Sequence, residues 1–240
     1  MTIVEPDSPL PVRTLIANTL LGALPAEGLD ALCAAAMVRH YKRNTLLCAA
    51  GRAVKHVWLV NEGRIEIFYR RTDGQESMVG AFGSSHWCVW VALFAEQPLN
   101  QDISAAAGST LISVPAVAMR RVLAEHASIY PLLIAEIAVR MQLLMQWVGQ
   151  SAVGNSEQRL AGLLHALGQL ENRHESPRCL RASQTRLAQA LGMHRHSVSK
   201  GLDALQGRGL IRAAYSRIEL LDPDGLCDFS LGPANPDGQD

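Results

Sequence analysis

"TRLAQALGMHRHSVSKGLDALQGRGLI", residues 185–211, holds two amphipathic helical patterns on either side of Gly192. Apolar residues recur at three- and four-residue steps in both parts, the spacing of one buried helix face. They are Leu187, Ala188 and Leu191, then Val198, Leu202 and Leu205. Glycine disfavours a helix interior by about 1 kcal/mol, and a polar, cation-rich run (residues 194–200) follows it. We therefore expect a break that aims the second helix at a partner.

The spacing around this break is that of a helix-turn-helix. Such a motif needs a small residue where its helices cross, a glycine in the turn four positions later, and an aliphatic residue six further on. Ala188, Gly192 and Val198 meet these needs, and Ser183 stands where the first helix would be capped. The polar run then begins the second helix, the part of such motifs that enters the major groove. Gly201 departs from the pattern, since an aliphatic residue is usual there and glycine softens a helix.

Residues 207–222 predict a two-stranded wing that turns at residues 214–216, beside Arg212 and Arg217. Wings commonly rest on the phosphate backbone. The alternative for the whole segment is an ordinary helical pair within a larger fold.

Charge is unevenly distributed, although the net charge of the chain is zero. Residues 176–217 hold eight Lys or Arg residues and one acid, Asp203, so they carry +7 and the remainder carries −7. A basic module on an acidic body favours a polyanionic partner for that module. Chance clustering on a solvated surface is the alternative.

Composition indicates a globular protein, with 240 residues, 48% hydrophobic and 18% charged. Five scattered cysteines without a CxxC pattern favour reduced thiols in the cytoplasm over disulfides or a zinc site. We expect no secretory signal, because residues 1–13 show no charged start followed by an apolar core. We expect no membrane partner, because Glu136 and Arg140 interrupt the longest apolar run.

The N-terminal half predicts a sheet domain. Residues 1–13 read as a loose tail and residues 14–41 as helical. Residues 56–82 alternate between apolar and polar with turns at residues 61–63 and 73–74, and residues 108–115 add a strand. Pro115 suits the first turn of a following helix. Short strands with no helices between them favour an antiparallel roll or barrel.

Residues 129–153 predict one long helix. A coiled-coil spacing of 3, 4, 3 and 4 joins Ile134, Ile137, Met141, Leu144 and Val148. Leu133, Leu143 and Trp147 widen the apolar face, so one side can serve the roll and the other a partner helix. We expect self-dimerisation through this seam; the alternative is a helix buried against its own domain. Ser156 is the expected N-cap of the next helix.

Taken together, these patterns resemble the Crp/Fnr family of bacterial transcription regulators over residues 20–226. The resemblance rests on LLGALPAEGLDAL (20–32), VWLVNEGRIEIF (57–68), SEQRLAGLLHAL (156–167) and, most specifically, residues 183–211. It implies an α+β fold: an antiparallel, cyclic-nucleotide-binding-like β-roll as sensor (14–127), a dimerisation helix (128–154) and a winged helix-turn-helix domain (155–240). It also implies a transcription regulator and not an enzyme, a homodimer on a palindromic operator of double-stranded DNA, with RNA polymerase as a further candidate partner and a small-molecule effector.

By position, the resemblance places Arg195, His196, Ser199 and Lys200 at bases or neighbouring phosphates, and Gln184 and Ser197 at phosphates. His196 replaces a glutamate of the best-known members, so their operator cannot be transferred. With His194 and the wing, the expected DNA contacts are Gln184, His194, Arg195, His196, Ser197, Ser199, Lys200, Arg212, Ser216 and Arg217.

The sensor departs from the family's cyclic-nucleotide binders. These carry Gly-Glu for the ribose and Arg-Ser or Arg-Thr for the cyclic phosphate. Here Val89-Trp90 and Gln101-Asp102 correspond. An apolar pair cannot accept hydrogen bonds from ribose hydroxyls, and a carboxylate without an arginine repels phosphate.

Other sensor chemistries stay open for the roll. Cys33 and Cys48 are too few and too far apart for an iron–sulfur cluster. His86 and Cys88 resemble part of a haem-dependent carbon monoxide sensor, but Trp90 stands where its histidine is expected. A thiol-based redox sensor is a further alternative. Trp87, Trp90 and Phe94 either line an apolar effector pocket or fill the core. The candidate effector residues are Trp87, Cys88, Val89, Trp90, Gln101 and Asp102.

Two other function classes compete. A metal enzyme on the β-roll would need several histidines and a carboxylate on adjacent strands, and His40, His56 and His86 lack that pattern. We expect no metal and no cofactor. The second class is a module that uses its winged domain for protein contacts, and the charge of +7 on residues 176–217 argues against it.

Overall fold

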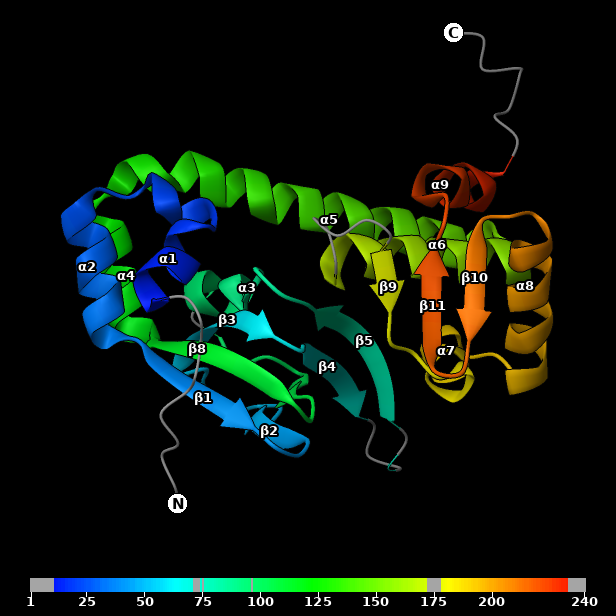
Figure 1. Cartoon of the computed structure of the whole chain (residues 1–240), viewed down its shortest axis with the longest axis horizontal. Helices are drawn as coiled ribbons and strands as arrows, with labels where there is room; N and C mark the ends of the chain where they lie inside the picture. The colour runs from blue at the N-terminus through cyan, green and yellow to red at the C-terminus, as the bar shows by residue number, and fades with distance from the viewer. Residues whose placement is uncertain (1–10, 71–73, 75, 96, 172–177, 233–240) are drawn as a thin grey trace, which may run out of the picture. The chain divides into compact units, whose positions relative to one another are not determined.

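A computed structural model describes residues 11–70, 74, 76–95, 97–171 and 178–232 (Figure 1). The chain divides into two compact units, Met1–Val139 and Arg140–Asp240. The division falls inside helix α5 (Tyr130–Val153), whereas the sequence analysis placed boundaries at the two ends of this helix.

Unit 1 holds two antiparallel four-stranded sheets. One sheet has the order β1-β8-β3-β6 and the other β2-β7-β4-β5. The strands are β1 Met37–Tyr41, β2 Thr45–Cys48, β3 His56–Glu62, β4 Ile65–Arg70, β5 Glu76–Phe82, β6 Trp87–Cys88, β7 Asp102–Ala105 and β8 Ser109–Pro115. The helices are α1 Val12–Ala17, α2 Ala26–Ala35, α3 Trp90–Ala95 and α4 Ala116–Glu125, with short 3-10 turns at Leu20–Ala23 and Ala127–Ile129. One apolar core joins strands and helices, which confirms the predicted antiparallel roll.

Three local predictions in unit 1 are wrong. Residues 37–41 were expected to be helical, but they form β1, because Met37 to Tyr41 pair with β8. A short helix, α3, interrupts strands that were expected to follow one another without helices. The first helix begins at Val12, inside the predicted tail. Asp73 of one predicted turn lies outside the described residues.

The predicted long helix is confirmed as α5, and its apolar surface is largely uncovered. The 27-residue helical segment Ala127–Val153 is long and apolar enough to cross a membrane, with a mean hydropathy of 1.4 over its most apolar stretch. Only 11% of that stretch is buried. This corrects the expectation that Glu136 and Arg140 exclude such a run. Length and composition alone are weak grounds for a span, because a helix that packs on a partner passes the same test.

Unit 2 packs the rest of α5 with α6 (Ser156–Glu171), α7 (Gln184–Leu191), α8 (Arg195–Gly207) and α9 (Pro223–Leu231). The wing strands β10 (Ile211–Ala214) and β11 (Arg217–Leu220) are as expected, but a third strand, β9 (Arg178–Leu180), pairs with β11. Neither β9 nor α9 was predicted. The cap of α6 is Asn155 and not Ser156, because Asn155 Oδ1 accepts from the backbone N–H groups of Glu157 and Gln158, both at 3.0 Å.

Candidate functional site

The turn between α7 and α8 has the geometry that its sequence predicts. Ser183 Oγ accepts from the Arg186 backbone N–H at 3.3 Å and so caps α7. Gly192 ends α7 with φ 60° and ψ 36°, a left-handed conformation that glycine adopts without a Cβ penalty. The Met193 N–H returns to the Ala188 carbonyl at 2.9 Å. The chain therefore reverses within three residues and starts α8 in a new direction.

Helix α8 lies with its apolar side against α6 and α7. All six residues of the predicted apolar face are buried: Leu187, Ala188, Leu191, Val198, Leu202 and Leu205. Gly201 is buried too, and a Cβ there would lie 2.8 Å from Leu160 Cδ2 of α6. The missing side chain thus permits close approach of the two helices, which explains the departure seen in the sequence.

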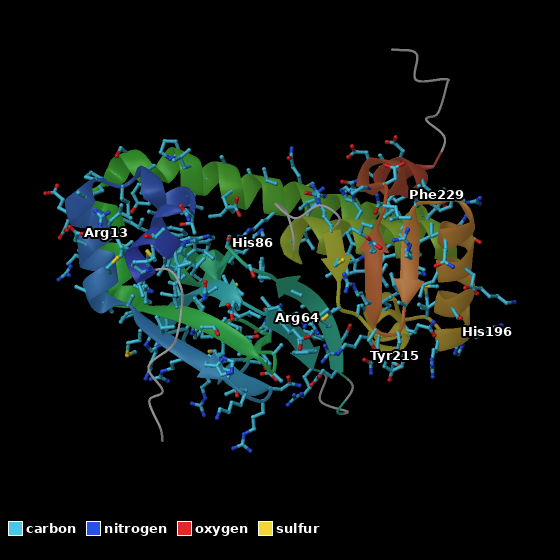
Figure 2. The ribbon with its side chains drawn as sticks, viewed as in Figure 1. Arg13, Arg64, His86, His196, Tyr215 and Phe229 are labelled. Carbon is cyan, nitrogen blue, oxygen red and sulfur yellow. The ribbon has the colours of Figure 1, made fainter. Side chains whose placement is uncertain are left out.

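The opposite side of α8 presents the polar run. His194, Arg195, His196 and Lys200 are exposed, whereas Ser197, Ser199 and Gln184 are half-buried. Arg195 Nε donates to Gln184 Oε1 at 3.4 Å, so the first residues of α7 and α8 meet. Figure 2 shows His196 at the same end of unit 2 as Tyr215 in the turn of the wing.

The wing carries two arginines in different electrostatic surroundings. Arg212 Nη1 donates to Glu219 Oε2 at 2.8 Å, so its charge is partly compensated. Arg217 Nη2 donates to Cys179 Sγ at 3.2 Å; this hydrogen bond raises the pKa of Arg217 above its ordinary value. Ser216 takes φ 53° in the turn. The partner Cys179 lies on β9, a strand that the sequence analysis missed.

The predicted seam of α5 is exposed over most of its length. Exposed fractions are 64% for Ile134, 58% for Met141, 54% for Leu144 and 57% for Val148. Ile137 is the exception, because it is partly buried against the core of unit 1. A row of exposed apolar side chains on one helix marks an interaction surface.

In unit 1 the candidate effector residues Trp87, Cys88, Val89 and Trp90 are all buried. Trp87 Nε1 donates to Thr19 Oγ1 at 2.9 Å, whereas Trp90 Nε1 is buried with no acceptor among the described residues. Val89 has φ 69°, an outlier for a β-branched residue. The backbone here therefore keeps a conformation suited to glycine, which the family's cyclic-nucleotide binders carry at this position.

Gln101 and Asp102 lie at the start of β7, and Asp102 has protein partners. Asp102 Oδ1 accepts from the Ala50 N–H at 2.7 Å, and its Oδ2 is 3.3 Å from Arg70 Nη2. The expectation of a carboxylate without an arginine is therefore wrong, because Arg70 lies beside Asp102. The same Arg70 nitrogen lies 2.7 Å from Glu76 Oε2, and two carboxylates thus compensate one guanidinium.

The residues considered for haem are packed inside the roll. Cys88 is completely buried, with Sγ 4.0 Å from the His86 carbonyl oxygen, and His86 Nδ1 is 3.0 Å from the Ser84 carbonyl oxygen. These partners do not form a haem ligand set. Among the described residues, no three His, Cys, Asp or Glu side chains group closely enough to hold a metal ion.

Two family models match the chain, one in each unit. Residues 38–126 match the cyclic nucleotide-binding domain, and residues 158–229 match the Crp-like helix-turn-helix domain. No curated protein matches the chain.

Several solved structures share the fold. The c-di-GMP-responsive global regulator CLP of Xanthomonas campestris has 22% identity and a TM-score of 0.59, over 82% of this chain and 99% of its own. FixK2 of Bradyrhizobium japonicum has 14% identity and a TM-score of 0.66, over 80% and 95%. A transcriptional regulator of the Crp/Fnr family from Eubacterium rectale has 20% identity and a TM-score of 0.60, over 86% and 95%. With both family domains present in this order, the chain belongs to the Crp/Fnr family of DNA-binding transcription regulators.

Proposed function

We propose that the protein is a cytoplasmic, homodimeric regulator that binds a palindromic operator and responds to an effector held in the β-roll. The observation that carries this proposal is the two-sided character of α8. Its apolar side is buried, and its N-terminal half turns His194, Arg195, His196 and Lys200 to solvent. Arginine and lysine at the start of such a helix can donate to guanine edges and phosphates.

The seam on α5 supports the homodimer. In a membrane, Glu136 and Arg140 would each have to be accommodated near the middle of the span, which is costly. A second copy of α5 covers the exposed apolar row and leaves these charges at the edge of the interface. A two-fold axis then presents two recognition helices, so the operator is an inverted repeat with half-sites about one helical turn apart.

Trp90 supports an uncharged effector in the roll. Its buried indole N–H has no acceptor among the described residues, and burying an unpaired donor is costly. Trp87 and Phe94 lie against its ring, at centroid distances of 5.8 and 6.2 Å. A small aromatic or apolar molecule with one acceptor atom fits these groups better than a phosphate does.

The thiols of unit 1 favour this effector over a redox sensor. Burial raises the pKa of the Cys33 and Cys48 thiols, and Asp102 adds to the effect at Cys48. A raised pKa lowers the thiolate fraction, and the thiolate is the reactive form. These cysteines are therefore expected to react slowly with oxidants.

Selection from sheared genomic DNA tests the proposal. Purified protein is incubated with the fragments, with and without extract from the source cells, and bound DNA is sequenced. We expect recovered fragments to share an inverted repeat, with stronger enrichment in extract if a small molecule is needed. The variant Arg195→Ala, Lys200→Ala serves as control and should recover no common sequence. Fragments without a shared sequence from the unaltered protein would refute sequence-specific binding.

A further inference from the structure

Helices α5 and α6 are joined by a link of two residues, Gly154 and Asn155. The C-terminal part of the seam, Met141 to Val148, belongs to the same compact unit as the recognition helix α8. Glycine gives the backbone of this link more conformational freedom than another residue would, so contacts between the helices help to hold their angle. The helix that makes such contacts is α9, which packs on α6 and reaches α5 (Figure 1).

The contact between α5 and α9 is a buried, directional hydrogen bond. Gln150 and Ser230 have exposed fractions of 6% and 3%, and Gln150 Nε2 donates to Ser230 Oγ at 2.7 Å. Ser230 Oγ in turn donates to the Cys227 carbonyl at 2.6 Å. A Cβ at Gly162 of α6 would collide with the Gln150 amide. This site is therefore shaped around Gln150.

A second contact lies one helical turn earlier on α5. Gln146 Nε2 donates to Cys227 Sγ at 3.2 Å. Gln146 and Gln150 are four residues apart and so share one face of α5. Two points of attachment resist rotation of α9 about either one.

The other side of α9 holds the C-terminal end of the recognition helix. The Arg208 guanidinium, at the C-cap of α8, lies 4.9 Å from the centroid of the Phe229 ring, and Figure 2 marks Phe229 beside this end of α8. The Leu221 and Asp222 N–H groups both donate to the Leu210 carbonyl, at 3.0 and 3.1 Å. Helix α9 thus contacts α5 on one side and the end of α8 on the other.

We propose that α9 sets the angle between α5 and the recognition helix, with Gln150 and Ser230 as positioning residues. In the dimer this angle determines the distance between the two recognition helices. The pair therefore determines which half-site spacing binds best. A hydrogen bond fixes direction as well as distance, whereas apolar contacts alone would let the helices slide. This inference rests on the proposed function, because spacing has meaning only for a dimer on an operator.

The test uses Gln150→Leu with Ser230→Ala in the full chain. Replacing both partners by apolar groups is close to neutral for stability, so the double variant should fold and dimerise. Affinity is measured by fluorescence anisotropy on the selected operator and on versions with the half-sites moved by one or two base pairs in each direction. We expect the preference for the natural spacing to fall by about two- to tenfold, the worth of one buried hydrogen bond. Binding to a single half-site should stay unchanged.

The control is Gln206→Ala, which removes the hydrogen bond from the Ala213 N–H to Gln206 Oε1 (2.9 Å) in the same unit. It should change affinity equally at every spacing. If the double variant keeps the spacing preference, or weakens all spacings alike, the positioning role is wrong while the proposed function stands. If the unaltered protein has no preferred spacing or sequence, the proposed function fails and this inference with it. Should the double variant not fold, Ser230→Ala alone is measured in the same series.

Discussion

Helix α8 in unit 2 and residues 87–90 in unit 1 use their chemistry in opposite ways. On α8 the charged and histidine side chains among the candidate binding residues are exposed, and the apolar side of the helix packs against α6 and α7. Residues 87–90 are buried. Val89 has a positive φ there, and the Trp90 indole N–H has no acceptor in the part of the chain that the structure describes. The exposed residues of α8 can therefore contact a ligand without any rearrangement of their own core, whereas a ligand at residues 87–90 depends on the side chains packed around them.

The largest expected effect on DNA binding is the loss of the dimer, because both recognition helices α8 must contact the operator together. Met141→Glu with Leu144→Glu should place like charges across the two-fold axis and give monomers in sedimentation velocity. Affinity for the operator should fall by about a hundredfold or more, because two linked half-sites gain that much from effective concentration.

The control for this experiment lies on the same helix. Val153→Glu adds charge at a residue that is 90% exposed and off the seam, so it should remain dimeric. A dimeric double variant would show that the seam is elsewhere.

A smaller effect should separate the two kinds of contact on the DNA side. Arg195→Ala should weaken operator binding by about 1–3 kcal/mol and relax preference at one base pair in each half-site, since its planar fork suits a guanine edge. Arg217→Ala on the wing should weaken all sequences alike and flatten the salt dependence.

Both variants are titrated on operator and scrambled DNA at several salt concentrations. An equal loss on both DNAs for Arg195→Ala would make it a backbone contact, and α8 would then be misplaced on the groove.

Sequence reasoning succeeds where the pattern is local. The α7–α8 turn follows from Ser183, Gly192 and helical periodicity, all within one short segment. It fails where distant partners decide. Residues 37–41 become a strand through pairing with β8, and Arg70 meets Asp102 only through the register of β4 and β7. The cap of α6 moves to Asn155 because Gln158 Oε1 reaches back to the Asn155 N–H at 3.0 Å, a reciprocal pairing.

The backbone strain at Val89 can be measured by comparing the stabilities of a glycine and an alanine variant, whose order should be opposite at residue 89 and in a regular strand. At φ 69° an alanine still carries the Cβ penalty of about 1–2 kcal/mol, whereas glycine does not. Val89→Gly should therefore be more stable than Val89→Ala by about 1 kcal/mol in denaturant unfolding. Val57 of β3, fully buried and paired in regular register with Val114 of β8, is the matched position, and there alanine should be the more stable replacement. If alanine were the more stable replacement at both positions, residue 89 would not have the positive φ of this structure.

The smallest expected effect is none at all: cyclic AMP and cyclic GMP should not bind unit 1. Val89 and Trp90 have no acceptor side chain for ribose hydroxyls. Asp102 is occupied by the Ala50 N–H and Arg70, and Arg70 is shared with Glu76, so a cyclic phosphate would meet two carboxylates beside a single compensated guanidinium. Calorimetric titration of the full chain should give only heats of dilution for both nucleotides. Micromolar binding of either cyclic mononucleotide would contradict this prediction. It would show that the roll recognises ribose and phosphate with residues other than 89–90 and 101–102.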